Sequence, residues 1–545
     1  MIKKVYVENF KSFDKPTIAD LSQLTIIAGA NSCGKSSLIQ ILLLLSQTLE
    51  NPRSEISLDL GGRYIQFSEF REAVFERPKN NEASFSVGFD VDLEELDIRN
   101  IQTFVLQSAS RLTRARYLNQ NENLSQVVNQ GKVRFDFRVS QSGRPFISRF
   151  LYKKDIIGVG EYKCELLRQK KNYKIDYQFT PYTKKRDGDA ELVKKSIDNI
   201  LEYIASSYTN TSNKKRRLEI NKLLQDNSTS HFDEIFRSLS TEFLRSSNVS
   251  KTPRLFLELA SEFENIQQAI FTTPVNRSTT IQTQFEHFLF YPIRFPTLDI
   301  QENYFYEKLN EQFRGIDSET KKFLRNIHYV GPLRAKPERA YLSTGTPIEI
   351  GNSGENAIPI LWANQNEKVF NKTKIGGNSK EQKLSVAVQS WLNEFGIATS
   401  FHITKPKRVI YQAEMESNSG SKLMVTIADV GFGVSQLLPV IVAGLQSRKG
   451  ATIILEQPEI HLHPRLQAKL ADFLICMAEL GKNIIVETHS EHLINMIRLR
   501  IIEDKTGVLQ EQIGILFSEL HRTCAMLHEI MDYRVPQISD KEFSN

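Results

Sequence analysis

The stretch GANSCGKSS, from Gly29 to Ser37, constrains the fold of this chain more than any other part of its sequence. An apolar run at 24–28 precedes it and is typical of a buried strand, and the residues from Ser37 onward have the apolar spacing of an amphipathic helix. A plain strand–turn–helix connection is one interpretation of this context. The glycines and the lysine between the two elements favour another, a loop that binds an anion.

Four residues of this stretch fit the pattern G-x-x-x-x-G-K-[ST]: Gly29, Gly34, Lys35 and Ser36. In that pattern, successive backbone N–H groups wrap a phosphate chain, the lysine reaches the outer phosphates and the hydroxyl binds Mg²⁺. The helix that begins near Lys35 points the positive end of its dipole at the same anion. We therefore expect a nucleotide and Mg²⁺ here, with these loop residues at the nucleotide: Asn31, Gly34, Lys35, Ser36 and Ser37.

A second apolar strand, predicted at 452–455, ends in the carboxylate of Glu456. This arrangement places an acid at the carboxyl end of a central strand, where we expect it to hold Mg²⁺ through water, together with Ser36. A surface acid after a core strand is the alternative. His461 and His463 follow closely, but no further histidine or cysteine cluster would complete a zinc site. We therefore interpret this turn as facing the nucleotide.

Two further polar stretches lie beside predicted elements. His489 follows a predicted strand at 484–486, a position from which its side chain can hydrogen-bond the terminal phosphate. The stretch 429–436 precedes a predicted helix; glycines such as Gly433 allow the backbone to approach an anion, and Ser435 adds a hydroxyl. An ordinary N-capped helix is the alternative. Two anion-binding stretches in one chain favour a site that a neighbouring subunit completes.

Together these motifs resemble those of the ABC-type ATPases of the structural-maintenance-of-chromosomes (SMC), Rad50 and RecF kind. The motifs are NFKSF at 9–13, the loop at 29–36, GFGVSQ at 431–436, EQPEIHLHP at 456–464 and THS at 488–490. More specifically, they resemble the bacterial AAA-like branch that includes the overcoming-lysogenisation-defect ATPases and PtuA, the ATPase of Septu and some retron antiphage systems. The resemblance covers roughly residues 1–75 and 325–520.

This resemblance implies an ATPase that forms a head-to-head dimer with two ATP molecules sandwiched between the heads. By position, it implies these roles: phosphate and Mg²⁺ binding for Lys35 and Ser36, the Walker B acid for Glu456, the switch histidine for His489, nucleotide binding for Lys11, and contact across the interface for Gly433 and Ser435.

One position departs from the usual ABC pattern, because Gln457 stands where a catalytic glutamate normally follows the Walker B acid. Glutamine can orient a water molecule but cannot accept a proton, and phosphoryl transfer depends mainly on positioning and electrostatics. We therefore expect slow hydrolysis, with ATP acting mainly as a clamp on the dimer, and Glu459 as a substitute for the missing acid. The expected catalytic residues are Glu456, Gln457, Glu459 and His489.

The fold class predicted is α/β: an ABC-type P-loop ATPase head with a mixed or parallel sheet and an antiparallel subdomain, interrupted by a large insertion that is first β and then helical. Helices alternate with strands over 434–516, which predicts parallel strands, and alternating runs predict antiparallel ones. The expected antiparallel strands lie at 57–60, 64–67, 83–89 and 133–139, and the expected helices at 190–206, 217–225, 232–243 and 381–395.

We divide the 545 residues into five parts. They are the N-terminal part of the ATPase head (1–75), a β-rich region (76–188), a helical insertion (189–325), the C-terminal part of the head (326–520) and a tail (521–545).

Composition bears on the cellular setting. The four cysteines are scattered, which predicts reduced thiols, and we find neither a signal peptide nor an apolar run long enough to span a bilayer. We therefore expect a cytoplasmic protein without membrane contact. The net charge of +6 permits contact with DNA or RNA but does not require it.

The resemblance also bears on partners. Overcoming-lysogenisation-defect proteins carry a nuclease domain after the ATPase, whereas only residues 491–545 follow the THS motif here. We therefore expect a homo-oligomer that regulates a separate HNH-type nuclease, with a reverse transcriptase and its nucleic acid product as further partners in retron systems. Two alternatives are a DNA-repair or chromosome ATPase that clamps DNA through basic runs at 184–186 and 214–217, and a scaffold that holds ATP without turnover.

Overall fold

The structure is a computed structural model, and it describes the chain in segments. The described residues are 2–31, 33–51, 57–78, 83–93, 129–156, 160–169, 172–181, 275–281, 316–342, 349–407, 409–417, 424–430, 432–521 and 524–529. The helices predicted at 190–206, 217–225 and 232–243 lie outside these residues, and so do the basic runs at 184–186 and 214–217.

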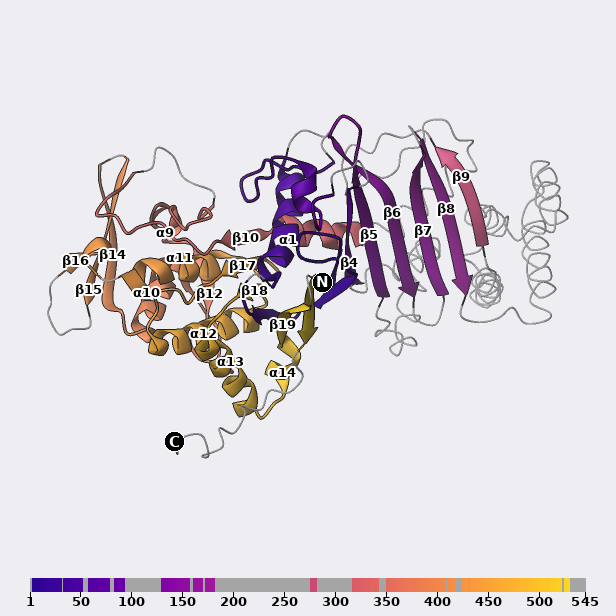
Figure 1. The fold of residues 1–545 in the computed structure, drawn as a ribbon. Coiled ribbons are helices and arrows are strands. Elements are labelled where there is room, and N and C mark those ends of the chain that lie inside the picture. The colour runs from indigo at the N-terminus through magenta and orange to yellow at the C-terminus, as the bar shows by residue number, and fades with distance from the viewer. Residues whose placement is uncertain are drawn as a thin grey trace, which may run out of the picture.

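A six-stranded sheet lies in the middle of the molecule (Figure 1). In spatial order its strands are β10 (Ile327–Val330), β17 (Thr452–Glu456), β18 (Asn483–Glu487), β3 (Leu24–Gly29), β19 (Ile513–His521) and β20 (Cys524–Glu529). The first five strands are parallel, and β20 pairs antiparallel with β19. This mixed, mainly parallel sheet confirms the predicted α/β class.

Neighbouring side chains of these strands enter two different cores, because successive residues of a strand point to opposite faces. Ile27 packs in one core with α1 (Lys35–Glu50) and the antiparallel sheet, whereas Ile26 packs in a second core. The helices of the second core are α9 (Ala357–Asn364), α10 (Leu384–Glu394), α11 (Phe432–Gln446), α12 (Pro464–Glu479), α13 (Glu491–Glu503) and α14 (Val508–Gln512). Burial on both faces explains why the strands are apolar along their whole length.

An eight-stranded antiparallel sheet extends to one side of the six-stranded sheet (right in Figure 1). In spatial order its strands are β2 (Thr17–Asp20), β1 (Ile2–Glu8), β4 (Ser84–Leu93), β5 (Asn129–Val139), β6 (Pro145–Ile156), β7 (Gly160–Gln169), β8 (Asn172–Pro181) and β9 (Val275–Ile281). The strands predicted at 83–89 and 133–139 are confirmed. Strand β9 lies within 189–325, so the stretch predicted to be helical also contributes a strand.

The strands predicted at 57–60 and 64–67 are wrong. These residues form turns, with a single isolated bridge between Gly61 and Gln66. The side chain of Gln47 on α1 replaces strand pairing: its amide donates to the carbonyls of Asp59 (2.6 Å) and Ile65 (3.0 Å), and its oxygen accepts from the N–H of Ile65 (2.9 Å). A buried glutamine therefore satisfies backbone groups that the sequence pattern assigned to a hairpin.

The predicted helix at 381–395 begins later than expected, at Leu384, because β13 (Lys380–Lys383) pairs with β12 (Lys368–Asn371). Helix α9 was not predicted. The other described elements are η1 (Phe70–Ala73), a helical segment at 316–325, β11 (Tyr341–Leu342), β14 (Ala398–Lys407), β15 (Ile410–Ser417), β16 (Met424–Thr426) and η5 (Ile427–Asp429).

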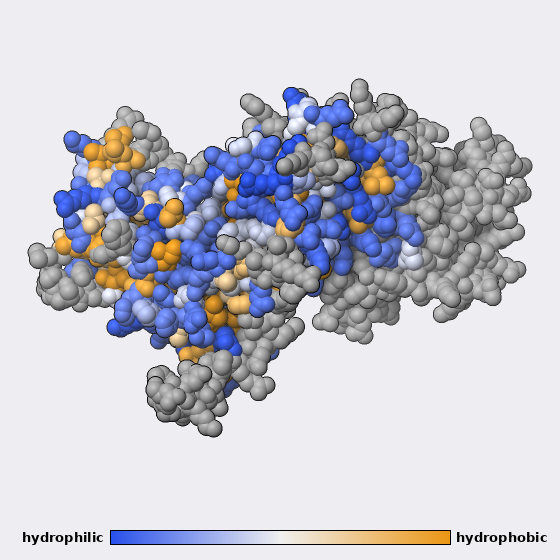
Figure 2. Space-filling view, viewed as in Figure 1, coloured by the Kyte–Doolittle hydropathy of each residue, from blue (hydrophilic) through white to orange (hydrophobic). Residues whose placement is uncertain are grey.

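Figure 2 shows that the described surface on this side is mainly hydrophilic, with apolar residues in small separate groups, several of them on the side that holds β14 and β15. Cys33, Cys164 and Cys476 are buried and carry no disulfide, as expected for reduced thiols. Within the described segments, no helix is both long and apolar enough to cross a membrane.

Candidate functional site

The loop between β3 and α1 is shaped by two glycines. Gly29 has φ 134° and Gly34 has φ 96°, values that favour glycine over other residues. A Cβ on Gly29 would lie 2.1 Å from the backbone oxygen of Ser518 on β19, so the loop and that strand approach too closely for any side chain. Gly34 is the N-cap of α1, which begins at Lys35 as predicted.

Lys35 is buried inside this loop. Its Nζ donates to the carbonyl of Gly29 at 3.0 Å and to the carbonyl of Ala30 at 2.5 Å. The ammonium therefore lies at the N-terminal end of α1, where a phosphate group would meet both its charge and the positive end of the helix dipole. Asn31, the remaining predicted loop residue before Gly34, is exposed.

The hydroxyl of Ser36 points to a carboxylate that is not among the predicted site residues. Its Oγ donates to Oε1 of Glu487 at 3.0 Å, and Glu487 is the last residue of β18, the strand beside β3. The second oxygen of Glu487 is buried without a hydrogen-bond partner in the described structure. Burial raises the pKa of Glu487, and the Ser36 hydrogen bond and the Lys35 charge oppose this rise. Like Glu456, Glu487 is a carboxylate at the end of an apolar strand, so the pattern that predicts Glu456 also fits Glu487.

Glu456 lies at the end of β17 and is the register partner of Glu487. Its Oε1 accepts a hydrogen bond from the hydroxyl of Tyr329 at 3.0 Å, and Arg334 donates to its backbone oxygen at 3.4 Å. Burial, followed by repulsion from Glu487, raises the pKa of Glu456 to about 7. Since β18 separates β17 from β3, Glu456 is one strand further from the loop than Glu487.

The residues after β17 fold back onto the end of β18. Gln457 has φ 45°, and its backbone N–H donates to the carbonyl of Glu487 at 2.7 Å. Oε1 of Glu459 accepts hydrogen bonds from the Thr488 hydroxyl (2.6 Å) and from the backbone N–H of His489 (2.9 Å). Three of the predicted catalytic residues, Gln457, Glu459 and His489, are therefore gathered at the ends of two adjacent strands, and the side chain of His489 is exposed to solvent.

The two histidines after this turn do not gather into a metal centre. His463 is the N-cap of α12 and accepts a hydrogen bond from the N–H of Arg465 at 3.3 Å. Within the described segments, no group of three or more histidine, cysteine, aspartate or glutamate residues is placed to hold a metal ion.

The NFKSF motif lies next to the start of α1. Oγ of Ser12 is 3.1 Å from Oγ of Ser37, a hydrogen bond that connects this motif with the predicted loop residues. Lys11 has φ 48°, and its Nζ lies 4.7 Å from the centre of the Phe67 ring. Partial burial lowers the pKa of Lys11.

Gly433 and Ser435 begin a helix that lies beside the turn after β17: a Cβ on Gly433 would be 3.8 Å from the Leu462 side chain and 4.0 Å from the His461 carbonyl oxygen. Both lie in the first turn of α11, which packs against α9, α10, α12 and β17, and Ser435 is buried. One chain therefore places the loop beside the ends of β17 and β18, and it places the start of α11 beside the turn that follows β17.

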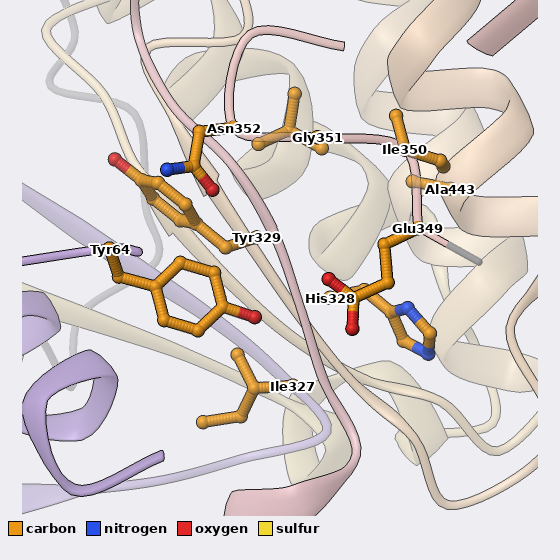
Figure 3. Close-up of a pocket in the computed structure, with 10 residues that line it drawn as sticks. Tyr64, Ile327, His328, Tyr329, Glu349, Ile350, Gly351, Asn352 and Ala443 are labelled. Carbon is orange, nitrogen blue, oxygen red and sulfur yellow. The ribbon is translucent and has the colours of Figure 1, made fainter. Parts of the chain in front are cut away.

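A small pocket lies next to Tyr329 (Figure 3). Its cavity volume is about 20 Å³, and its lining includes Tyr64, His328, Tyr329, Glu349 and Asn352. In Figure 3 the carboxylate of Glu349 lies beside the ring of His328. No residue of the phosphate loop lines this pocket, so we do not assign a nucleotide to it.

A comparison with known protein families agrees with the motifs. Residues 1–494 match the model of a family described as AAA ATPase domain, and this stretch spans the loop, both acidic strand ends and His489. Among solved structures, the chain is similar to the Smc head domain of Pyrococcus furiosus crystallised with the C-terminal domain of ScpA (13% identity over 97% of this chain and 96% of that chain, TM-score 0.35). It is also similar to the SMC head domain of Thermotoga maritima (9% identity over 97% of this chain and 98% of that chain, TM-score 0.34).

No curated protein sequence matches this chain. The structural likenesses are distant at these identities and TM-scores, so the assignment rests on the family match, which covers most of the chain. This chain belongs to the AAA ATPase domain family.

Proposed function

We propose that this protein binds Mg·ATP at the loop between β3 and α1, hydrolyses it slowly, and uses it to hold two copies of the ATPase head together. The observation that carries the proposal is the junction of Lys35 and Ser36 with the carboxyl ends of β17 and β18. Phosphate-binding groups and acidic groups meet there at one edge of a parallel sheet.

The side chains at this junction fit Mg²⁺ and a nucleotide. Lys35 and the N-terminus of α1 supply positive charge for phosphates, while Ser36, and Glu456 through water, supply the oxygen groups that Mg²⁺ prefers. When bound, Mg²⁺ would neutralise the charge that develops on the transferred phosphoryl group. The buried oxygen of Glu487 without a hydrogen-bond partner is consistent with a cation at this place.

Slow turnover follows from what the side chains near the strand ends can do. The amide of Gln457 can orient a water molecule but accepts no proton. Oε1 of Glu459 accepts from Thr488 and His489 and so holds the His489 loop, while its Oε2 is buried without a hydrogen-bond partner among the described residues. The proposed division of roles is therefore water orientation by Gln457 and contact with the terminal phosphate by His489.

Binding, turnover and light scattering of the purified protein test this proposal. We expect ATP to bind in the presence of Mg²⁺, turnover to be slow, and ATP to shift the protein from monomer to dimer. Lys35→Ala should abolish all three effects, because it removes the charge inside the loop. Equal ATP affinity in Lys35→Ala and wild type would contradict the proposed binding site. A dimer that forms equally well with and without ATP would contradict the proposed role of ATP in dimerisation. Dimers in which ATP stays intact for many hours would identify the protein as a scaffold without turnover.

We further propose that the ATP-bound dimer regulates a separate effector nuclease of the HNH type in antiphage defence. Two observations support this second proposal. The ATPase motifs resemble those of PtuA, and Gln457, in place of a catalytic glutamate, favours a long-lived ATP-bound dimer over rapid ATP turnover. Purification of the protein from its native host, with mass analysis of the co-eluting proteins, tests it. A nuclease that co-elutes supports the proposal, whereas a lone ATPase with strong, salt-dependent DNA binding would identify a clamp that acts on DNA itself.

A further inference from the structure

We infer that Glu487 and Ser36 both bind the Mg²⁺ ion directly. Glu456, which lies one strand further from the loop, contacts the ion through a water molecule. This inference rests on the proposed function, because the remaining ligands would come from the nucleotide and from water. The metal role was expected of Glu456 and Ser36 alone. The reasons to include Glu487 are its place in the sheet, its contact with Ser36 and its second oxygen.

The order of the strands places Glu487 nearer the loop than Glu456. Glu487 is the register partner of Ile27 on β3, two residues before the loop begins at Gly29. Glu456 is on the next strand, and since neighbouring strands are about 4.8 Å apart, its backbone is roughly 10 Å from β3. A side chain at that distance reaches a cation near Ser36 most easily through a water molecule.

The contact between Glu487 and Ser36 already has the spacing of two metal ligands. Oγ of Ser36 is 3.0 Å from Oε1 of Glu487. In octahedral Mg²⁺ sites the metal–oxygen distance is about 2.1 Å, so two adjacent ligands at a right angle are about 3.0 Å apart. A cation could therefore bind both oxygens without a change in their separation, provided that the serine hydroxyl turns its proton away.

The second oxygen of Glu487 needs a partner. Glu487 is 3% exposed, and its Oε2 is buried without a hydrogen-bond partner in the described part of the chain. Lys35 is the neighbouring cation, but its Nζ is directed to the carbonyls of Gly29 and Ala30. Because a buried carboxylate oxygen without a partner is unfavourable, a bound cation or a water molecule of its shell would stabilise this oxygen.

The small number of protein ligands predicts when the metal binds. The described residues contain no group of three or more acidic, histidine or cysteine side chains placed to hold a metal ion. Mg²⁺ is commonly bound by one or two carboxylates, several waters and the phosphates of a nucleotide. We therefore expect Mg²⁺ to bind together with ATP and only weakly to the protein alone.

The test compares nucleotide affinity with and without Mg²⁺. The dissociation constant of a fluorescent ATP analogue is measured in EDTA and in Mg²⁺, and their ratio gives the Mg²⁺ enhancement. In Glu487→Gln we expect the affinity in EDTA to be equal to or higher than that of wild type, since a negative charge is removed. We expect the Mg²⁺ enhancement to fall by about tenfold. Ser36→Ala should reduce it similarly, and the double variant should lose little more than the single ones, because both oxygens serve one ion.

Two further variants keep the test decisive. Glu479→Gln removes a carboxylate outside the site, which pairs with Lys372 at 2.8 Å, and should leave the enhancement unchanged. Glu487→Asp keeps the charge but withdraws the oxygens from Ser36, so it should lose part of the enhancement even if the glutamine variant fails to fold. Full enhancement in Glu487→Gln, or an equal loss of affinity in EDTA and in Mg²⁺, would overturn the inference. If wild type binds the analogue in neither buffer, the proposed function fails instead.

Discussion

The carboxylate of Glu459 accepts a hydrogen bond from the backbone N–H of His489 at 2.9 Å. The same oxygen accepts from the hydroxyl of Thr488 at 2.6 Å, so one side chain on the turn after β17 fixes the first two residues after β18. Because Glu459 itself is buried, this connection is shielded from water. The position of His489 therefore depends on a residue thirty positions earlier in the chain.

Replacement of Glu459 should lower turnover, by displacing the His489 loop, without lowering the affinity for ATP. Glu459→Ala leaves the buried Thr488 hydroxyl and the His489 N–H without an acceptor, so we expect turnover to fall by about 10- to 100-fold through misplacement of the loop. Glu459→Gln keeps an acceptor oxygen and should retain most of the activity. ATP affinity, measured in parallel, should change little in both variants. Equal losses in the two variants would show that the charge of Glu459 matters more than its hydrogen bonds.

Substitution of Gly29 should destabilise the head. Gly29→Ala places a Cβ 2.1 Å from the backbone oxygen of Ser518 and imposes φ 134° on a residue with a side chain. We expect a loss of about 3 kcal/mol or more in the free energy of unfolding, measured with urea. Gly61→Ala is the matched control, because a Cβ there meets no atom within 4 Å, and its effect should stay within about 0.5 kcal/mol. If both variants unfold at the urea concentration of wild type, the close approach of β3 and β19 is wrong.

Lys482 should contribute more to the free energy of unfolding as the pH rises above about 7. This lysine is buried, donates to the carbonyls of Gly444 and Leu445 at the end of α11, and has its pKa lowered by burial to about 7 from 10.5. Between these values the unfolded chain binds a proton that the folded chain does not, so the contribution of Lys482 to stability rises with pH, by at most about 1.4 kcal/mol per pH unit. The measurement is urea unfolding of wild type and Lys482→Met at pH 7, 8 and 9. The difference in unfolding free energy should move in favour of wild type as pH rises; a constant difference would contradict the lowered pKa.

The sequence predicted the parts of the site that depend on local order. Gly34, Lys35 and Ser36 lie between a strand and a helix that follow one another, and both of these elements are found where they were predicted. The partner of Ser36 could not be found in this way, because the nearness of Glu487 depends on β18 lying between β17 and β3. Strand order is set by packing across the whole sheet and leaves no mark in a local pattern.

A similar reason explains the hairpin wrongly predicted at 57–67. Its apolar alternation is real, but Gln47, a residue on the preceding helix, satisfies the backbone groups that strand pairing would otherwise use. The hydrogen bonds of the buried Gln47 side chain therefore favour turns over strands in this segment. The same limit applies to Ser435, since a role across a dimer interface depends on a second chain.

Gln457 offers the sharpest test of why turnover should be slow. Gln457→Glu changes an amide to a carboxylate of the same shape, and because both residues carry the same φ 45° penalty, the backbone strain stays constant. If Gln457 orients the attacking water, the new carboxylate can accept its proton, and the turnover number should rise by about tenfold or more. Gln457→Ala should lower the turnover number below that of wild type while ATP still binds, as measured by phosphate release and by equilibrium binding in the same buffer. A glutamate variant no faster than wild type would show that another residue orients the attacking water. Glu487, whose carbonyl accepts from the Gln457 N–H at 2.7 Å, would then be the next carboxylate to replace in a turnover measurement.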